Sequence, residues 1–392
     1  MSVPFWGLIS LLTFILYKDM HITPLQMTLF IIIKPMSALF SPYWSQVIHQ
    51  RPDRIVSNLI WGNILRYLPF LFVPWINSAW IIIGAFGLYM MFYRGTSIVW
   101  AETIKTNIPP LSQEKLIAFG SALDHCAIAL LPFILGSLLD TNPQAWRWLF
   151  PLTAAFGLLS TAFIYYTPAS KLAPTLLPIQ LGAWDLFKRH ILKPWKDSWQ
   201  LIKKDTNFSH FQIGFMLGGA SLMILQSTIP ILFADVLKLS YTKLLIAMTI
   251  CKSVGYVLTT PLWVKFFRRV NIYYFSSFVT ILVALFPFLL LSSQIHILFL
   301  YCAFALYGII QAGSELSWHM SGPIFAKEKD STIFSGTNVL AVGIRGCVIP
   351  PLGALLYTLT NSVVVMIAGS LLGLLATAYF IRYSAAPKIE EA

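Results

Sequence analysis

The sequence predicts an all-α membrane protein whose twelve transmembrane helices form two parallel six-helix repeats. Of its 392 residues, 57% are hydrophobic and only 11% are charged, and the mean hydropathy is +0.73. This composition is too apolar for a water-soluble domain. Apolar segments near the roughly 20 residues that a helix needs to cross a bilayer recur from one end of the chain to the other.

The apolar segments are continuous rather than alternating, which indicates helices rather than strands. The expected spans are 3–17, 22–46, 55–77, 79–101, 116–139, 146–166, 208–235, 242–264, 272–292, 295–320, 332–358 and 361–383. Most of the 27 Lys and Arg residues fall in the loops on the side of the two termini. By the positive-inside rule both termini are cytoplasmic, and we expect a bacterial inner membrane. The net charge of +12 therefore reflects topology, and no nucleic-acid partner is expected.

One phrase of the sequence is written twice. "AFGLYMMFYRGTSIVW", Ala85–Trp100, returns as "AFALYGIIQAGSELSW", Ala303–Trp318, 218 positions later. The same offset relates Lys34 to Lys252, and matches in several helix pairs indicate an internal duplication. The duplication predicts that helices four and ten are symmetry mates.

The domain organisation follows from this repeat. An N-terminal half, residues 1–167, is joined by a basic linker, 168–206, to a C-terminal half with a short tail, 207–392. The linker predicts an amphipathic helix, kinked at Pro194, that lies on the cytoplasmic leaflet or binds a partner. Helix seven begins near Phe208, so its counterpart would begin about ten residues before Met1, and we expect helix one to be truncated.

Two parallel six-helix repeats joined by a basic linker resemble the major facilitator superfamily of secondary transporters. "AWRWLF" (145–150) resembles the family's Trp-Arg-Trp-x-Phe start of helix six, and Arg94 in "YRGTS" resembles the arginine of its Arg-x-x-x-Gly motif. "LPFILGSLL" resembles the antiporter-associated Gly-Pro-x-x-Gly-Gly motif only at Pro132 and Gly136, and Asp53-Arg54 matches part of the loop motif. The resemblance implies a midplane site between two rocking halves, and the incomplete motifs leave the subfamily open.

Charged residues inside a membrane cost about 2.5–3.5 kcal/mol each on insertion scales and therefore need a reason. Five cations stand against two carboxylates within the expected spans: Lys34, Arg66, Arg94, Lys252 and Arg345 against Asp124 and Glu315. This excess of positive charge favours an anionic substrate over a cationic one.

Lys34 and Lys252 occupy equivalent positions, so one lysine from each half is predicted to hold the anion. Each lysine could instead pair with a carboxylate of its own half or extend its stem toward the interface. Arg345 is expected either to contact the substrate as a third cation or to form a salt bridge with Glu315. Trp6 is a further candidate for the cavity wall.

The helix that carries Arg345 also carries Pro350 and Pro351, which are predicted to interrupt it one turn later. Arg66 has no symmetric counterpart and is expected to reach toward an end of helix three.

Arg94 and Asp124 lie in sequential helices and are expected to form an ion pair, or to leave Asp124 as a carboxylate that gains and loses a proton during transport. Glu315 is the other candidate for proton coupling. His319 follows Glu315 at i+4, and His125 adjoins Asp124, so each histidine could relay protons or simply pack through a hydrogen bond.

These patterns predict a secondary active transporter that moves a small organic anion by alternating access, coupled to protons as a symporter. Anion exchange and efflux antiport are the alternatives, and a non-transporting membrane sensor on the same fold is the alternative from another class. The sequence contains no zinc-protease motif, phosphate-binding glycine loop or nucleophile elbow, so neither an enzyme nor a cofactor is predicted. The expected partners are the solute, the lipid bilayer and protons, and the protein is expected to be a monomer.

Overall fold

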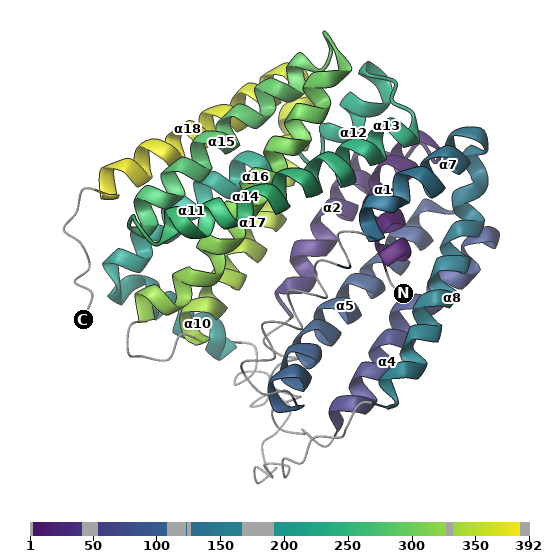
Figure 1. Ribbon diagram of the computed structural model, residues 1–392, viewed down its shortest axis with the longest axis horizontal. Coiled ribbons are helices and arrows are strands. Elements are labelled where there is room, and N and C mark those ends of the chain that lie inside the picture. Colours follow the sequence, from purple (N-terminus) through teal and green to yellow (C-terminus); the bar gives the residue numbers. More distant parts are fainter. Residues whose placement is uncertain are drawn as a thin grey trace. The chain divides into compact units, whose positions relative to one another are not determined.

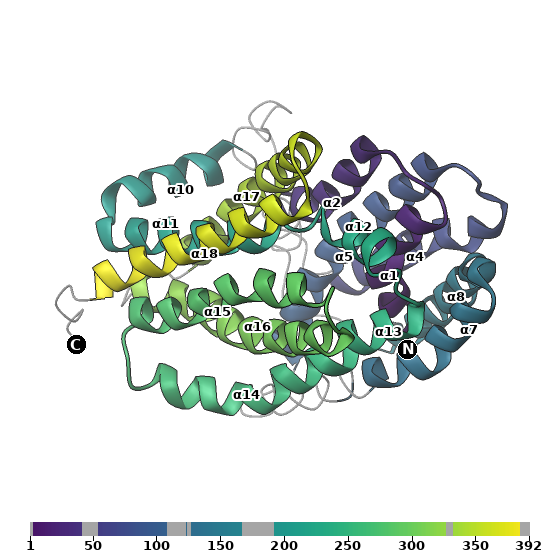
Figure 2. The ribbon, with the colours of Figure 1, turned by 90° about the horizontal axis from the view of Figure 1, so that it is seen from above.

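The computed structural model describes residues 3–40, 54–107, 123, 127–166, 192–326 and 332–384. These residues are almost entirely helical (Figures 1 and 2). They belong to two compact units, Met1–Pro194 and Trp195–Ala392. The predicted boundaries of the halves and linker stay predictions, and each unit is described by itself.

The first unit contains helices α1 Val3–Lys18, α2 Pro24–Ala38, α4 Ile55–Tyr67, α5 Ala79–Asn107, α7 Ser137–Thr141 and α8 Trp146–Ile164. Helix α4 continues as a 3-10 segment, Leu68–Trp75, and α7 follows a π-helical turn, Pro132–Gly136. Thr23 starts α2 with a capping box, because its side chain accepts from the Gln26 N–H while the Gln26 side chain accepts from the Thr23 N–H.

The second unit contains α10 Lys193–Lys204, α11 Thr206–Met223, α12 Ile229–Ile231, α13 Tyr241–Leu245, α14 Lys252–Phe267, α15 Ile272–Ser292, α16 Ile297–Ala326, α17 Thr332–Leu359 and α18 Ser362–Ser384. π-Helical turns occupy Leu232–Val236 and Ile246–Cys251. Asp205 caps α11 by accepting from the Phe208 N–H at 2.9 Å.

The helices lie where the sequence predicts spans. Helix α15 coincides with the predicted span 272–292, and α5 and α16, which carry the doubled phrase, begin 218 positions apart at Ala79 and Ile297. In the described part of the chain, seven helices are long and apolar enough to cross a membrane, and two shorter apolar helices accompany them. The total of twelve spans stays a prediction.

A helix interruption lies in a different place from the predicted one. Helix α17 runs without a break through Pro350 and Pro351, so the predicted interruption there is wrong. Each proline removes one N–H donor and crowds the carbonyl four residues earlier, yet the helix continues through both positions. The break falls instead at residues 224–228, between α11 and α12. Gly353 lets α17 approach this break, since a Cβ there would lie 2.1 Å from the Ile224 carbonyl oxygen.

Aromatic side chains form the core of the first unit. The Phe5 ring of α1 lies edge-on to the rings of Tyr67 and Phe70, with 5.0 Å between centroids in each pair. Phe70 also packs against Phe150 of α8 at 5.4 Å. Gly157 admits the Tyr67 ring, because a Cβ there would lie 2.6 Å from it. Helices α1, α4 and α8 therefore meet around one aromatic centre.

The second unit combines an aromatic core with polar contacts between helices. Its buried cluster includes Phe208, Phe211, Phe325, Phe334 and Phe380, against which Leu201 of α10 packs. Helix α15 runs beside α18 in both ribbon views (Figures 1 and 2). Buried hydroxyl groups join the helices in two pairs, Ser276 with Ser317 and Thr280 with Thr377, each with 2.9 Å between oxygens. Such contacts add specificity where lipid gives little hydrophobic force between helices.

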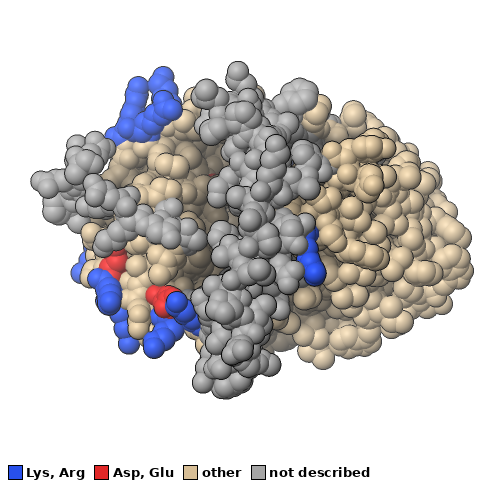
Figure 3. Space-filling model, turned by 90° about the horizontal axis from the view of Figure 1, so that it is seen from below, with Lys and Arg blue, Asp and Glu red and all other residues tan. Residues whose placement is uncertain are grey.

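The surface of the described residues is largely free of charge. On the face in Figure 3, Lys, Arg, Asp and Glu side chains gather in a few patches and leave broad areas of other residues between them. Many large apolar side chains are exposed, among them Trp80, Phe133, Leu258 and Leu375. An extensive apolar exterior is what contact with lipid requires.

Candidate transport site

Two glycines bring α14 and α16 into backbone contact. A Cβ added at Gly308 would lie 2.0 Å from the Lys252 carbonyl oxygen, and one added at Gly255 would lie 2.1 Å from the Ala305 carbonyl oxygen. Only hydrogen side chains fit such a crossing. The close approach brings Tyr256, which follows Gly255, within hydrogen-bonding reach of Glu315, two turns after Gly308.

Glu315 lies beside this crossing and is held by two neutral donors. The Tyr256 hydroxyl donates to Glu315 Oε2 at 2.7 Å, and Gln311 Nε2 donates to Glu315 Oε1 at 2.7 Å. Both carboxylate oxygens therefore accept hydrogen bonds from neutral groups. The other polar atom of Gln311, Oε1, is buried and has no hydrogen-bond partner among the described residues.

Lys252 lies on the same pair of helices. Its Nζ is 5.3 Å from the centre of the Tyr307 ring, within the range of a cation–π contact. It also interacts electrostatically with Glu315. Lys252 directly follows the π-helical turn Ile246–Cys251, and such turns are frequent at functional sites because they alter the direction of the next side chain. A cation and a carboxylate thus share one site in the second unit.

Arg345 of α17 occupies a separate pocket against α11. Its Nη1 donates to the Phe215 carbonyl at 2.6 Å, and its guanidinium lies 5.2 Å from the centre of the Phe215 ring. Gly219 makes the space, because a Cβ there would lie 1.9 Å from Nη1. Arg345 is 6% exposed, and its Nε has no partner among the described residues. The structure thus gives Arg345 and Glu315 different partners.

In the first unit, Arg66 lies in the last turn of α4, near the middle of the apolar span Ile55–Trp75. The expectation that it reaches toward an end of the membrane span stays a prediction. Its Nη2 donates to the Tyr67 hydroxyl at 2.6 Å, and its Nη1 lies 3.4 Å from Thr96 Oγ1. Tyr89 also faces the guanidinium, with 5.8 Å to the ring centre. The aromatic neighbours keep the cation inside the membrane span.

Tyr89 of the first unit and Tyr307 of the second unit have similar surroundings. They are the tyrosines of the doubled phrase, 218 positions apart, and each has a cation over its ring: Arg66 in the first unit and Lys252 in the second. Lys34, which sequence position pairs with Lys252, is exposed on α2. The tyrosine in the repeat was the signal in the sequence that could have drawn attention to Arg66.

The remaining predicted residues fall in several places. Trp6 is half-buried on α1 and stacks on Tyr93, with 5.1 Å between ring centroids. His319 is exposed on α16, and the hydrogen bonds of Glu315 go to other residues. Arg94 is half-buried on α5, and its Nε has no partner among the described residues. Asp124 and His125 lie outside the described residues, so their predicted roles stay predictions.

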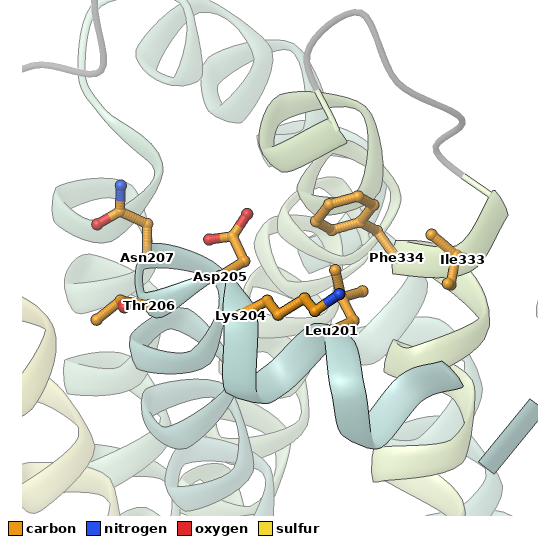
Figure 4. Close-up of a pocket in the computed structure, with 7 residues that line it drawn as sticks. All are labelled: Leu201, Lys204, Asp205, Thr206, Asn207, Ile333 and Phe334. Atoms are coloured by element: carbon orange, nitrogen blue, oxygen red, sulfur yellow. The ribbon is translucent and has the colours of Figure 1, made fainter. Parts of the chain in front are cut away.

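A surface pocket of about 580 Å³ lies away from these residues, where α10 meets the starts of α11 and α17. Figure 4 shows Lys204 and Asp205 on the side of α10 and α11, with Ile333 and Phe334 across from them. Asp205 is already engaged as the cap of α11. None of the predicted site residues lines this pocket, so it is not the candidate transport site.

The long apolar helices of the described residues are those of an integral multi-pass membrane protein. Residues 1–344 match the sequence profile of the Major Facilitator Superfamily. The chain therefore belongs to the Major Facilitator Superfamily, as the sequence resemblance predicted.

Solved structures agree with this fold. A POT family transporter in complex with 5-aminolevulinic acid is 11% identical, with a TM-score of 0.77 over 98% of this chain and 93% of the other. The nucleoside transporter NupG is 13% identical, with a TM-score of 0.70 over 97% and 96%. A bacterial homolog of the human lysosomal transporter Spinster is 13% identical, with a TM-score of 0.61 over 98% and 96%. The sequence matches none of the curated proteins.

Proposed function

We propose that this protein is a secondary active transporter that carries a small organic anion together with a proton by alternating access. On this proposal its twelve spans form two parallel six-helix repeats with both termini in the cytoplasm, and it works as a monomer in a bacterial inner membrane. The family membership and the 218-residue spacing of α5 and α16 support the architecture.

The observation that carries the proposal is the site around Glu315. A carboxylate inside the membrane is held by the neutral donors Tyr256 and Gln311, with Lys252 close enough to attract it. A carboxylate whose hydrogen-bond donors are neutral can accept a proton without breaking a hydrogen-bonded ion pair. Glu315 is therefore our candidate for the group that couples transport to protons.

The same site suggests how anion binding and protonation are linked. An anion that pairs with Lys252 withdraws that cation from Glu315, and a proton then neutralises the carboxylate. Conversely, a protonated Glu315 leaves Lys252 without its attracting charge and ready for an anion. Each ligand thereby favours the binding of the other, which favours transport of both together.

The anionic charge of the solute is supported by the surplus of cations over carboxylates within the predicted spans. Lys252 and Arg345 in the second unit, with Lys34 in the first, are the proposed substrate contacts, and Trp6 is a proposed wall of the cavity. The relatives include carriers of nucleosides and peptides, and their identities of 11–13% support a shared fold only. A non-transporting sensor would instead be expected to pair its buried charges internally.

The test is uptake into proteoliposomes. We would present labelled benzoate, succinate, glycerol 3-phosphate, uridine monophosphate, uridine and dialanine, with and without an inward proton gradient. The proposal expects the gradient to drive accumulation of at least one of the anions. It expects no accumulation of uridine, which is neutral, or of dialanine, which is zwitterionic. Uptake of uridine or dialanine alone would refute the anionic substrate, and no uptake of any solute would favour the sensor.

Two variants test the coupling. Glu315→Gln retains side-chain shape and hydrogen-bonding capacity but cannot ionise, so it should abolish gradient-driven accumulation while preserving exchange of anion across the membrane. His319→Gln removes a titratable group one turn away and should leave accumulation unchanged. If His319→Gln loses coupling while Glu315→Gln retains it, the proposed role of Glu315 is wrong.

A further inference from the structure

Arg66 has more hydrogen-bond donors than its surroundings accept. A guanidinium carries five N–H groups, and the described residues accept from it only at Tyr67 and, over a longer distance, at Thr96. Its Nε is buried and has no partner, and no carboxylate among the described residues pairs with it. A buried charged donor left unsatisfied costs on the order of 1–3 kcal/mol or more.

Aromatic rings explain how the cation is tolerated but not how its donors are used. The guanidinium carbon lies 4.5 Å from the centre of the Tyr67 ring, 5.8 Å from Tyr89 and 5.9 Å from Tyr93. Contacts of this kind contribute about 0.5–2 kcal/mol each. They stabilise the charge through ring faces and leave the N–H groups in the plane of the guanidinium free to donate.

The open side of this cluster is also aromatic. Trp6 stacks on Tyr93 at an interplanar angle of 23°, and Trp6, Tyr93 and Arg66 are all half-buried rather than enclosed. By contrast, Tyr89 is only 2% exposed. The cluster is therefore closed at Tyr89. It is partly accessible where the Arg66 guanidinium and the rings of Trp6 and Tyr93 lie together.

We propose that Arg66, Trp6 and Tyr93 form an anion subsite in the first unit that binds the carboxylate or phosphate of a solute with a flat conjugated ring. The two terminal N–H groups that do not donate to Tyr67 or Thr96 provide the paired donors that an oxyanion accepts. The ring of the solute then packs on Trp6 or Tyr93. This subsite specifies the substrate of the proposed transporter and so rests on the proposed function.

Binding to the purified full-length protein tests the subsite without requiring transport. We would measure thermal stabilisation in detergent by benzoate, acetate, inorganic phosphate and neutral benzamide. Benzoate should bind at least tenfold more tightly than acetate or benzamide, and Arg66→Gln should weaken benzoate binding at least tenfold. Arg66→Lys should be intermediate because it retains charge without the planar fork. Thermal stabilisation by inorganic phosphate shows whether an oxyanion without a ring is sufficient for binding.

Matched variants separate local roles from general damage. Arg54→Gln removes an exposed arginine from the start of the same helix, α4, and should leave benzoate binding unchanged. Trp6→Leu should reduce benzoate affinity toward that of acetate while changing acetate binding little. If Arg66→Gln does not fold, modification of wild-type arginines by phenylglyoxal, mapped by mass spectrometry, should show that benzoate protects Arg66.

Three results would overturn the subsite: no stabilisation of the wild type by benzoate, unchanged benzoate affinity in Arg66→Gln, or equal binding of benzoate and benzamide. Benzoate binding that depends on Arg66 but is not followed by uptake into proteoliposomes would refute the transport proposal and leave the subsite intact. Proton-driven uptake of an anion at the same rate in Arg66→Gln as in the wild type would refute the subsite and leave the transport proposal intact.

Discussion

Replacement of Gly308 by alanine is the most direct test of how the site around Glu315 is assembled. The new Cβ would lie 2.0 Å from the Lys252 carbonyl oxygen and 2.8 Å from the Tyr256 backbone nitrogen. Ordinary contact begins at 3.4 Å, so α14 and α16 must separate locally by about 1.4 Å, the difference between 3.4 and 2.0 Å. Both obstructing atoms belong to the backbone, and neither can move by rotating a side chain.

The expected energy follows from two opposing terms. Alanine favours a helix over glycine by about 0.5–1 kcal/mol, whereas overpacking typically costs about 1–3 kcal/mol. We therefore expect net destabilisation of about 1–2 kcal/mol, with a fall in Tm of about 2–4 °C per kcal/mol. A separation of 1.4 Å also stretches the bond from Tyr256 to Glu315 from 2.7 Å to about 4 Å, beyond hydrogen-bond range.

Thermal unfolding of the detergent-purified protein, followed by tryptophan fluorescence, measures the first effect, and proton-driven uptake measures the second. Gly336→Ala is the matched control, because it lies on α17 of the same unit and a Cβ there meets no atom within 4 Å. Its Tm should equal or slightly exceed that of the wild type. If Gly308→Ala is as stable as the wild type and transports as well, the backbone contact does not position the site.

Three further predictions use other parts of the structure. Gly219→Ala should displace the Arg345 guanidinium, because its Cβ would lie 1.9 Å from Nη1; a lowered Tm with loss of substrate affinity checks this, and unchanged values would contradict it. Tyr256→Phe removes one donor to Glu315, a change of about 1.5–3 kcal/mol for a bond to a charged group. Its proton-driven uptake should shift in pH dependence relative to the wild type, whereas an identical pH profile would show that this bond does not tune Glu315. Helix α10 exposes Trp199, and the Nζ of Lys203 lies 5.2 Å from the Trp199 ring. The amide hydrogens of α10 should therefore exchange more slowly in nanodiscs of anionic lipid than in nanodiscs of neutral lipid. Equal exchange rates would argue for a protein partner instead.

The positions of the helices could be predicted from sequence because membrane crossing depends on local composition. Helix α15 occupies the predicted span 272–292, and α8 begins at Trp146, where a span was expected. The break at 224–228 could not be predicted in this way. That segment contains neither glycine nor proline, and its contacts are with α17, which is distant in sequence.

The candidate site was predictable in its charges but not in their partners. Glu315, Lys252 and Arg345 stood out because charge is rare inside a membrane. Tyr256 is one of 16 tyrosines in the sequence and Gln311 is an uncharged residue, so neither stood out. Only the glycine crossing of α14 and α16 brings them to Glu315. Whether Arg345 meets a carboxylate likewise depended on Gly219, which opens a pocket for it on another helix.

The tyrosines beneath Arg66 and Lys252 have a consequence for how relatives of this protein should be compared. If the halves arose by duplication, the ring stayed at its position while the cation above it came to be supplied by a different helix in each copy. Two residues can then do the same chemical task without ever occupying the same column of an alignment. A relative that has lost Arg66 could carry its replacement on any helix that passes over Tyr89, and a comparison that follows the ring rather than the arginine would find it.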